Sequence, residues 1–424
     1  MAIVKPFKGY RPPKNMADEV ACLPYDVMNA EEAAIMAKGK DRSLLHITRA
    51  EIDIKEAVDP HSEAVYEQSL KNFNRFKKSG ILVQDTEAKY YIYAQTMNGH
   101  TQYGIVGVAS CSDYENGIIK KHELTRPDKE EDRKVLMRKL KANIEPVFFT
   151  YRAVPEIDHI VSKIVETQEP EYDFVAEDGF GHHFWTIDDQ AVNDEIERLF
   201  RDKVPFTYVA DGHHRTAAAA GLGAEFAAKN PNHRGDESYN YFMAVHFPDT
   251  QLKIIDYNRL VKDLNGHSSE EILDLLQKDF DIAEISSQII KPASLHQIAM
   301  YLQGKWYLLK AKPHTYDDTK PLESLDVTVL SKYVLAPLFN ITDLRRDSRI
   351  DFVGGIRGLE ALQERVDKGE MAIAFAMFPV SMEQLMNIAD SGNIMPPKVT
   401  WFEPKLRSGL VIHQFLNAEP NGKG

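Results

Sequence analysis

The sequence predicts an α/β or α+β protein with mixed sheets and flanking helices, and two observations carry this prediction. Strand-like segments rich in β-branched and aromatic residues alternate with helix-like segments along nearly the whole chain of 424 residues. Hydrophobic residues make up 43% of the chain, which is enough for a large buried core. A chain of this length is expected to hold about two or three domains, or one elaborate domain.

In the first part of the chain, residues 1 to about 30 contain several prolines and are expected to be irregular. The predicted strands that follow are 44–48, 89–97, 101–110, 147–151, 183–187 and 204–209. The predicted helices are 31–38, 61–79, 127–142, 154–167, 190–201 and 216–228. Asn98-Gly99 is a strong hairpin signal and joins two of the strands, and Pro127 suits the first position of its helix.

The later part of the chain alternates in the same way. Its predicted strands are 239–247 and 252–257, which are expected to form a second hairpin, and 306–311 and 371–378. Its predicted helices are 269–279, 325–339, 359–368 and 382–389. We expect two regions, 1–258 and 259–424, with the basic C-terminal loop of the second returning to the cleft of the first.

The charge balance argues against a nucleic-acid partner. The chain has 51 Lys and Arg against 64 Asp and Glu, a formal net charge of −13. Nucleic-acid binding depends on Lys and Arg side chains that neutralise phosphates. We therefore expect no nucleic-acid partner.

Membrane anchoring and cysteine chemistry are not expected either. The N-terminus has no apolar stretch of signal-peptide length, and nowhere do about 18 apolar residues follow one another. Cys22 and Cys111 are the only cysteines and have no metal-like spacing, so neither a disulfide framework nor a Cys-rich zinc site is available. These features predict a cytoplasmic protein with no membrane partner.

The densest group of chemically active residues is Asp211-Gly212-His213-His214-Arg215. It lies between an apolar strand-like segment and an alanine-rich helical one, and such a junction directs the first helical N–H groups and the positive end of the helix dipole to one point. Gly212 permits a positive φ or a close backbone approach, and Arg215 suits a bidentate grip on phosphate or carboxylate. The motif predicts phosphate binding. The alternative is that Asp211 caps the helix and the histidines are polar filling.

A second group combines His122 and Glu123 with Asp132 and Arg133. His122 and Glu123 precede the helix that begins near Pro127, at its anion-attracting end. Asp132 and Arg133 are neighbours on this helix and are expected to face different ways rather than form a simple pair. Glu123 suits a general base and His122 a phosphate or substrate contact. The alternative is a solvated, charge-rich helix start.

A third group lies in Met395–Gly409, where prolines stiffen the backbone and aromatic residues are interspersed. It places Lys398 and Lys405 seven residues apart. A basic loop of this kind near the end of the chain suits closure over a phosphorylated ligand. The alternative is a solvated tail, although such a tail would not need the Trp401-Phe402 pair.

These groups also carry a family resemblance. The landmarks occur in order over essentially the whole chain, and they are Pro6–Arg11, Pro24–Val27, Lys121–Glu123 with Asp132–Arg133, Ala210–Arg215, Leu325–Val327, Met395–Lys398 through Lys405, and Ser408–Leu410. With them the chain resembles the bacterial and archaeal domain of unknown function 1015 family. Some proteins of that family carry a ParB-like, chromosome-partitioning label.

The resemblance extends to a motif. Gly212, His214 and Arg215 match the Gly-x-His-Arg phosphate-binding pattern of the wider ParB/sulfiredoxin group, whose members bind nucleotides and include free-serine kinases. It implies a ParB/sulfiredoxin-like core. His213 stands where sulfiredoxin has its reactive cysteine, which excludes sulfinic-acid reduction. Partitioning is doubtful as well, because the chain is acidic and has no convincing helix-turn-helix.

The resemblance implies a nucleotide-dependent kinase of a small hydroxyl-bearing metabolite, such as serine or a similar amino acid, with ATP or ADP and Mg²⁺. Phosphoryl transfer asks the protein mainly for positioning and charge stabilisation. The predicted catalytic residues are Asp211, Glu123 and His213. The predicted phosphate- and nucleotide-binding residues are Gly212, His214, Arg215, His122, Arg133, Lys398 and Lys405. The predicted substrate contacts are Asp26 and Thr400.

Two other functions stay open at this point. His122, His213, His214, Asp211 and Glu123 are potential ligands for a divalent ion, which would suit a metal-dependent hydrolase of a small phosphorylated substrate. Adjacent histidines on a regular element diverge, which disfavours this alternative. The other alternative is a non-catalytic, nucleotide-binding regulator. The sequence is compatible with an oligomer.

Overall fold

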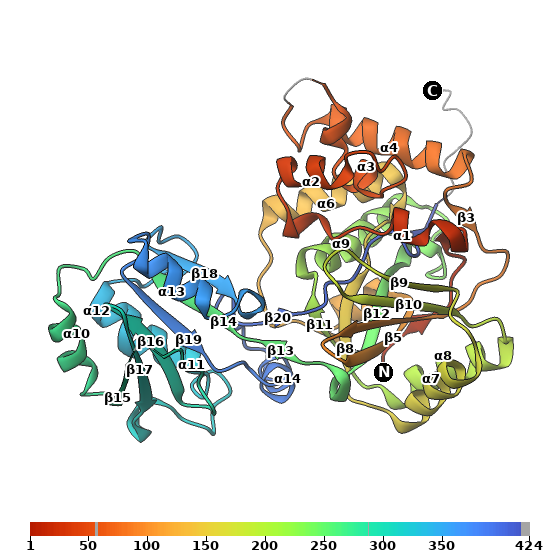
Figure 1. Cartoon of the computed structure of the whole chain (residues 1–424). Coiled ribbons are helices and arrows are strands. Elements are labelled where there is room, and N and C mark those ends of the chain that lie inside the picture. The colour runs from red at the N-terminus through yellow and green to blue at the C-terminus, as the bar shows by residue number, and fades with distance from the viewer. Residues whose placement is uncertain (56–57, 287, 417–424) are drawn as a thin grey trace. The chain divides into compact units, whose positions relative to one another are not determined.

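The computed structural model describes residues 1–55, 58–286 and 288–416. Contacts within the chain define two compact units, shown in Figure 1. Unit 1 comprises Met1–Leu252 and Pro404–Gly424, and unit 2 comprises Lys253–Glu403. These bounds differ from the predicted regions 1–258 and 259–424 mainly at the C-terminus, where the residues from 404 onward belong to unit 1. Helices and mixed sheets alternate as predicted, so the α/β class is confirmed.

The central element of unit 1 is a mixed sheet in which parallel and antiparallel pairs occur together. Its strand order is β6 (Ile119–Lys120), β11 (Thr207–Asp211), β8 (Val147–Tyr151), β12 (Tyr241–Pro248), β5 (His100–Ser110), β4 (Tyr91–Met97), β10 (Gly181–Thr186) and β9 (Tyr172–Val175), with β1 (Val4–Lys5) on β5. The pairs β11 with β6 and β12 with β8 are parallel. The predicted hairpin between β4 and β5 is confirmed, and Asn98 and Gly99 have the positive φ values of 50° and 77° that its tight turn requires.

The helices of unit 1 follow the predicted pattern closely. They are α1 (Ala17–Val20), α2 (Ala30–Ala37), α3 (Leu45–Thr48), α4 (Glu63–Lys78), α5 (Cys111–Glu115), α6 (Pro127–Leu140), α7 (Pro155–Thr167), α8 (Gln190–Lys203) and α9 (His213–Lys229). Pro127 occupies the start of α6, where its missing N–H costs nothing.

The prediction of a strand at 44–48 is wrong, because this segment forms α3. Leu44, Leu45 and Ile47 are all buried in a cluster of helices. So short an apolar run has no periodicity that separates a strand from a helix.

The two faces of the unit 1 sheet are covered differently. Val147 and Phe149 on one face of β8 pack with the alanine-rich side of α9, and Tyr151 on the same face packs with α7 and α8. Tyr91 and Tyr93 lie on the opposite face, where the terminal segments of the chain cover them. The ring of Phe7 contacts that of Tyr91, and the backbone N–H of Arg407 donates to the hydroxyl of Tyr93 at 3.1 Å.

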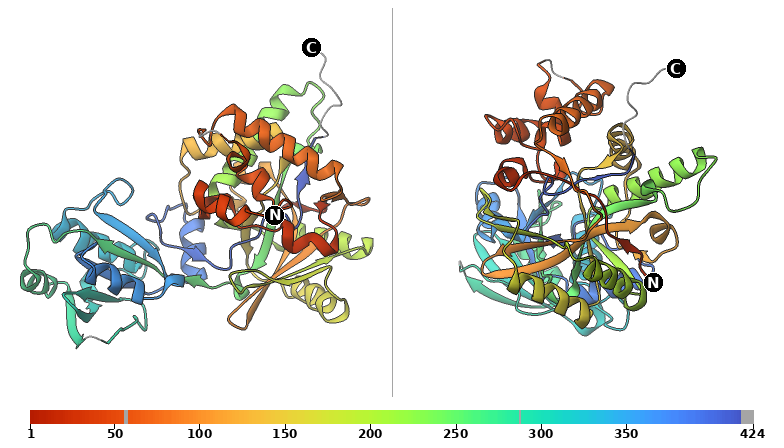
Figure 2. Two further views of the ribbon diagram at one scale, coloured as in Figure 1. Left: turned by 45° about the horizontal axis from the view of Figure 1, so that its top comes forward. Right: turned by 90° about the vertical axis from the view of Figure 1, so that its right-hand side faces the viewer.

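The C-terminal segment is therefore built into unit 1, as the blue trace among the red N-terminal segments shows in Figure 2. β21 (His413–Gln414) pairs with β7 (Ala142–Asn143), and the backbones of Cys22 and Ser408 form a bridge. Near them β2 (Tyr10–Arg11) pairs with β3 (Val83–Gln84). These pairings fix the course of the chain just after residue 404.

Unit 2 has an antiparallel sheet of its own. The strand order is β15 (Phe280–Ser286), β17 (Lys305–Ala311), β16 (Gln297–Leu302), β19 (Ile373–Met377), β14 (Tyr257–Val261) and β18 (Ile350–Gly354). A separate pair joins β13 (Ile254–Ile255) to β20 (Trp401–Phe402). The helices are α10 (Ser269–Leu276), α11 (Asp326–Leu330), a π-helical turn at Ser331–Leu335, α12 (Ala336–Phe339), α13 (Glu360–Asp367) and α14 (Met382–Asp390).

The second predicted hairpin, between 239–247 and 252–257, is wrong. β12 has β5 on one side and β8 on the other, so both of its edges are already paired. The chain leaves β12 through a short helical turn at Asp249–Gln251 and enters unit 2, where β13 pairs with β20 instead. The sequence spacing allowed a hairpin, but the long-range pairing of β12 prevented it.

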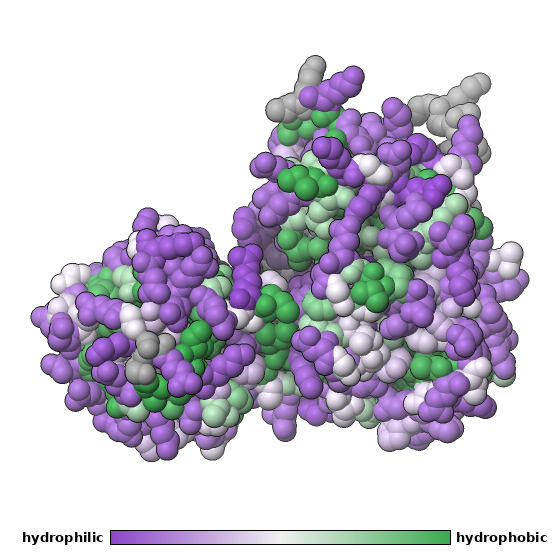
Figure 3. Space-filling view, in the orientation of Figure 1, coloured by the Kyte–Doolittle hydropathy of each residue, from purple (hydrophilic) through white to green (hydrophobic). Residues whose placement is uncertain are grey.

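The surface of unit 1 seen in Figure 3 is largely hydrophilic, with apolar residues interspersed. Within the described residues, none of the helices combines the length and the apolar character that crossing a bilayer requires.

Candidate functional site

The predicted strand-to-helix junction is confirmed in unit 1. β11 ends at Asp211, Gly212 takes a left-handed conformation with φ 93° and ψ 33°, and α9 begins at His213. The N-cap residue of α9 is Gly212, so no N-cap side chain binds the first N–H groups of this helix. The alternative in which Asp211 caps the helix is wrong, because its carboxylate binds cations instead.

The side chain of Arg215 folds back over the junction. Its Nη1 donates to the carbonyl of Pro146 at 2.6 Å and its Nη2 donates to Asp211 Oδ2 at 3.3 Å. A Cβ atom on Gly212 would lie 3.1 Å from the guanidinium, which is a tight contact, and the positive φ at this position favours glycine. Arg215 Nε is buried and has no hydrogen-bond partner among the described residues. The Nε–H group of Arg215 is therefore a hydrogen-bond donor that no described residue accepts.

The carboxylate of Asp211 lies between two cations. Lys405 Nζ is 3.5 Å from Oδ1, and Arg215 contacts the other oxygen. Burial would raise the pKa of Asp211, but Lys405 and then Arg215 outweigh this effect and hold its pKa below the usual value. Asp211 is therefore ionised near neutral pH and fixes both cations at the junction. The predicted return of the C-terminal loop brings Lys405, from a segment far away in sequence, to this point.

His213 and His122 form a buried pair of imidazoles beside the junction. Their ring centroids are 4.5 Å apart and the rings meet edge to face. Burial lowers the pKa of His213 to about 4 and that of His122 to about 3, so both rings are neutral at pH 7. His213 Nε2 is buried without a hydrogen-bond partner among the described residues, and Glu123 Oε2 lies 3.9 Å from the other ring nitrogen.

His214 has a different environment from that of its neighbour. Its Nε2 accepts a hydrogen bond from the backbone N–H of Arg126, the residue before α6, at 3.1 Å. Burial lowers the pKa of His214 as well. His214 therefore links the start of α9 to the start of α6, and the two adjacent histidines point to different partners.

Asp132 and Arg133 contact each other directly, so the expectation that they face different ways is wrong. Arg133 Nε donates to Asp132 Oδ2 at 2.8 Å, and the other oxygen of Asp132 accepts from Tyr66 and contacts His61, each at 2.7 Å. Arg133 Nη1 also contacts Glu145 at 3.4 Å. Side chains of adjacent residues diverge at Cβ, but the long arginine side chain bends back far enough to meet the aspartate.

The Pro-Tyr-Asp turn lies beside this network. Tyr25–Val27 form a short helical turn, and the Arg133 guanidinium lies 3.8 Å from the centroid of the Tyr25 ring. Asp26 is exposed, and its charge is the largest electrostatic contribution that raises the pKa of Arg215 against the opposing effect of burial.

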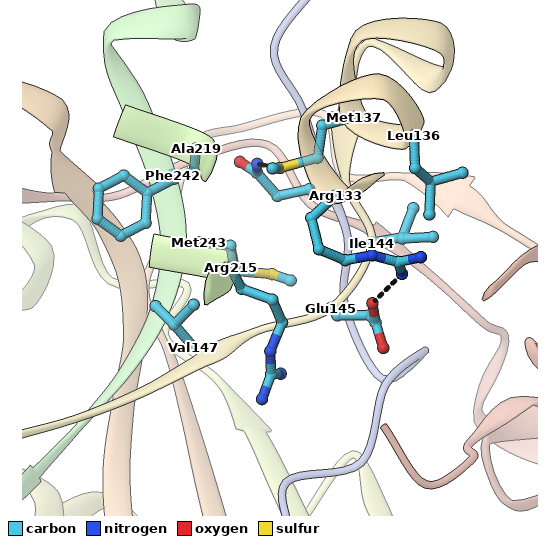
Figure 4. A pocket seen from close by; sticks show the side chains of 11 residues that line it. Arg133, Leu136, Met137, Ile144, Glu145, Val147, Arg215, Ala219, Phe242 and Met243 are labelled. Carbon is cyan, nitrogen blue, oxygen red and sulfur yellow. Dashed lines mark hydrogen bonds and ion pairs between the residues drawn. The ribbon is translucent and has the colours of Figure 1, made fainter. Parts of the chain in front are cut away.

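A small cavity lies behind the junction, and Figure 4 shows Arg215 and Arg133 lining it together with Glu145. Its other lining residues are Leu136, Met137, Asn143, Ile144, Val147, Ala219, Phe242 and Met243. About 20 Å³ is open to the centre of a water molecule, which is room for roughly one water. The cavity is too small for a nucleotide.

The remaining predicted contacts belong to unit 2. Lys398 is exposed, has a positive φ of 59°, and its carbonyl accepts a hydrogen bond from the buried Arg259 at 3.0 Å. Thr400 lies next to β20 in the same segment. Their contribution to the site of unit 1 stays a prediction.

A metal ion and a nucleotide need different ligands from the protein. Within residues 1–55, 58–286 and 288–416, no group of three or more His, Cys, Asp or Glu side chains is arranged to hold a metal ion. Mg²⁺ in phosphoryl-transfer sites usually takes one or two protein carboxylates and completes its shell with water and phosphate. Arg215 Nε and His213 Nε2 are buried without hydrogen-bond partners among the described residues, and Asp211 and Glu123 are the carboxylates next to them.

Glu145 was missed by the sequence analysis. It is buried, contacts Arg133, and accepts a hydrogen bond from the backbone N–H of Tyr25 at 3.0 Å. Tyr25 lies 120 residues away in sequence. The available signal was a lone carboxylate just before the apolar strand 147–151, where a buried acid requires a cationic partner.

Comparison with known proteins identifies a family model. The model described as a protein of unknown function, DUF1015, matches residues 4–328. None of the curated proteins matches the chain.

Several solved structures are similar to the chain at low sequence identity. A free serine kinase in complex with AMP is 14% identical with a TM-score of 0.35, and the match covers 72% of this chain and 91% of the kinase. SbnI with a C-terminal truncation from Staphylococcus aureus is 13% identical with a TM-score of 0.40, covering 75% and 90%. A conserved hypothetical protein from Pyrococcus furiosus is 14% identical with a TM-score of 0.33, covering 72% and 95%. Similarity at this level assigns no function to the chain.

Proposed function

The chain belongs to the DUF1015 family of proteins of unknown function, and we propose that this member transfers a phosphoryl group from an adenine nucleotide to the hydroxyl of a small metabolite. The proposal is based on buried polar side-chain atoms that have no hydrogen-bond partner among the described residues and lie at the junction of β11 and α9. Arg215 Nε and His213 Nε2 are buried and have no hydrogen-bond partner within the described residues. The N-cap of α9 is Gly212, which has no side chain to bind the first N–H groups of the helix. An unsatisfied buried polar group costs about 1–3 kcal/mol, so an acceptor-rich ligand gains by binding here.

The charges at the junction support a phosphate ligand. Arg215 and Lys405 both contact the carboxylate of Asp211, so two cations meet at the end of β11. The positive end of α9 lies at the same point. Phosphate oxygens accept several charge-assisted hydrogen bonds, and the arginine fork suits them better than a single lysine would.

We assign different roles to the carboxylates of Asp211 and Glu123. Because cations hold the pKa of Asp211 below its usual value, it is a weak base at neutral pH and suits the positioning of Lys405 and Arg215, or a contact with Mg²⁺. Glu123 is about one third exposed and stands beside His213, so it is the better candidate for taking the proton of an acceptor hydroxyl. Bound Mg²⁺ would neutralise charge on the transferred group.

Binding and product formation test this proposal on the unchanged protein. Calorimetric titration with ATP and ADP, each with and without Mg²⁺, is expected to give saturable binding. Incubation with a panel of hydroxyl amino acids and related metabolites is expected to give one phosphorylated product by mass spectrometry. Absence of saturable binding for both nucleotides at millimolar concentration rejects the proposal, and tight binding without product in any acceptor favours the non-catalytic regulator.

Gly212 offers a matched test of the junction geometry. Gly212→Ala places an L residue at φ 93°, which costs about 1–2 kcal/mol, and pushes a Cβ against the Arg215 guanidinium. Gly235→Ala is the control, because Gly235 has φ 92° with open space around its Cα. Both variants are expected to lose a similar free energy of unfolding in urea, whereas only Gly212→Ala should weaken ADP binding, by about tenfold. Equal ADP affinity in the two variants would contradict the proposed role of Arg215.

A further inference from the structure

His61 and Asp132 form an imidazole–carboxylate pair that has no role in the phosphate site as proposed. His61 Nδ1 lies 2.7 Å from Asp132 Oδ1. The side chain of Asp132 is only 5% exposed, whereas that of His61 is 50% exposed. In an ordinary surface pair both members lie in solvent, and such a pair contributes little to stability. Here a buried carboxylate holds an exposed ring, so the carboxylate orients the imidazole.

The other partners of Asp132 fix the direction of this hydrogen bond. The hydroxyl of Tyr66 donates to Oδ1 at 2.7 Å, and Arg133 contacts Oδ2 through Nε and Nη2 at 2.8 and 2.6 Å. Burial would raise the pKa of Asp132, but Arg133, Tyr66 and His61 outweigh this effect and hold its pKa below the usual value. An ionised carboxylate only accepts hydrogen bonds. In a neutral His61 ring the proton therefore lies on Nδ1, and Nε2 carries a lone pair.

The backbone around His61 is held as well. The N–H of His61 donates to Asp59 Oδ1, and the N–H of Ser62 donates to the carbonyl of Asp59, each at 2.9 Å. Ordering an exposed side chain costs conformational entropy. Within residues 1–55, 58–286 and 288–416, no group donates a hydrogen bond to His61 Nε2. The ordered ring thus has an acceptor nitrogen that the described part of the chain does not use.

The pair lies on the helix whose start contacts the phosphate site. The N-cap residue of α6 donates its backbone N–H to His214. Asp132 lies about 9 Å along the helix axis from that end, at about 1.5 Å per residue. The next residue, Arg133, lines the small cavity behind the junction together with Arg215 (Figure 4). The imidazole and the phosphate site therefore belong to one connected part of unit 1.

We propose that His61 is a binding residue beside the phosphate site, and that its Nε2 accepts a hydrogen bond from a hydroxyl group of the ligand. The inference rests on the proposed function, because it extends the site from the phosphate to a hydroxyl-bearing part of the reactants. A neutral nitrogen with a lone pair selects a donor and does not suit a carboxylate or phosphate oxygen. The ribose of the nucleotide and the acceptor metabolite both carry such hydroxyl groups.

His61→Phe removes the acceptor nitrogen and tests the proposal. The ligands for calorimetry are ADP and 2′,3′-dideoxy-ADP, which lacks the ribose hydroxyls, and the KM of the acceptor metabolite is measured in parallel. If the ribose is the donor, the variant binds ADP about fivefold more weakly and binds the dideoxy nucleotide as the parent does. If the metabolite is the donor, its KM rises about fivefold and ADP affinity stays the same. His61→Gln, which keeps an oxygen acceptor, is expected to restore part of either effect.

His183→Phe is the matched control. His183 Nδ1 also contacts an aspartate, Asp173, at 2.9 Å, but that carboxylate is 63% exposed. This variant is expected to match the parent in ADP affinity and in KM. Parent-like ADP affinity in His61→Phe, without a rise in the KM of any acceptor, overturns the inference and leaves the proposed function intact. An equal loss for ADP and the dideoxy nucleotide also overturns it, because the effect on the phosphate site is then indirect. If the parent binds no nucleotide, the proposed function fails and the inference fails with it.

Discussion

Replacement of Arg215 by alanine is expected to weaken ADP binding by about 10- to 100-fold, which corresponds to the loss of charge-assisted hydrogen bonds to phosphate. Two features make this the largest expected effect on binding. Burial holds the guanidinium in one place, and its Nε has no partner among the described residues. The positive charge also remains at every accessible pH, because neighbouring carboxylates, Asp26 first among them, raise the pKa of Arg215 against the opposing effect of burial.

Two further variants make the Arg215 result specific. Arg215→Lys keeps the charge but not the fork, so its ADP affinity is expected to lie between those of the parent protein and the alanine variant. Arg138→Ala removes a half-exposed arginine from the α6 surface and is expected to leave ADP affinity unchanged. Calorimetric titration at constant ionic strength measures all three variants. Parent-like affinity in Arg215→Ala would show that the guanidinium serves only to hold Asp211 and Pro146.

The junction was predictable because its signals are local. A strand that ends before Asp211-Gly212 and a helix that starts at His213 are read from neighbouring residues, and the same holds for the Asn98-Gly99 hairpin and for Pro127 at the start of α6. In each case the physical cause acts within a few residues, through φ, a missing N–H or a periodic apolar face.

The rest of the site depends on contacts that no local pattern encodes. Lys405 reaches Asp211 because the C-terminal segment pairs with residues near the N-terminus, as in the Cys22–Ser408 bridge. The contact of Glu145 with Tyr25 likewise joins residues 120 positions apart in the sequence. The helix at 45–48 and the pairing of β12 were also decided by tertiary packing, which overrides short-range preference.

His246 provides a prediction about stability, because both of its ring nitrogens are buried without hydrogen-bond partners among the described residues. The ring packs between those of Phe149 and Phe200 in the core of unit 1. An unpaired buried polar group costs free energy, so His246→Phe is expected to raise the free energy of unfolding by about 1 kcal/mol at pH 7. The added volume of phenylalanine sets a limit on this gain.

The same residue is expected to make the protein sensitive to acid. Burial lowers the pKa of His246 to about 3 in the folded protein, whereas an unfolded histidine has a pKa of about 6.5. As the pH falls below about 6.5, the unfolded chain binds a proton that the folded protein excludes, so stability is lost between pH 6.5 and 3. Buried His122, His182 and His413, whose pKa values burial also lowers to about 3, act in the same direction.

Urea unfolding at pH 7 and pH 5 tests the contribution of His246. The loss of unfolding free energy between these two pH values is expected to be smaller in His246→Phe than in the parent protein, by about 2 kcal/mol, because one proton-linked group has been removed. His159→Phe, which replaces an exposed histidine on α7, tests whether loss of any histidine has this effect. An identical loss in His246→Phe and the parent would mean that the His246 ring is protonated or hydrated in the folded core. The acid sensitivity of unit 1 would then have to come from the other buried histidines, among them His122, His182 and His413.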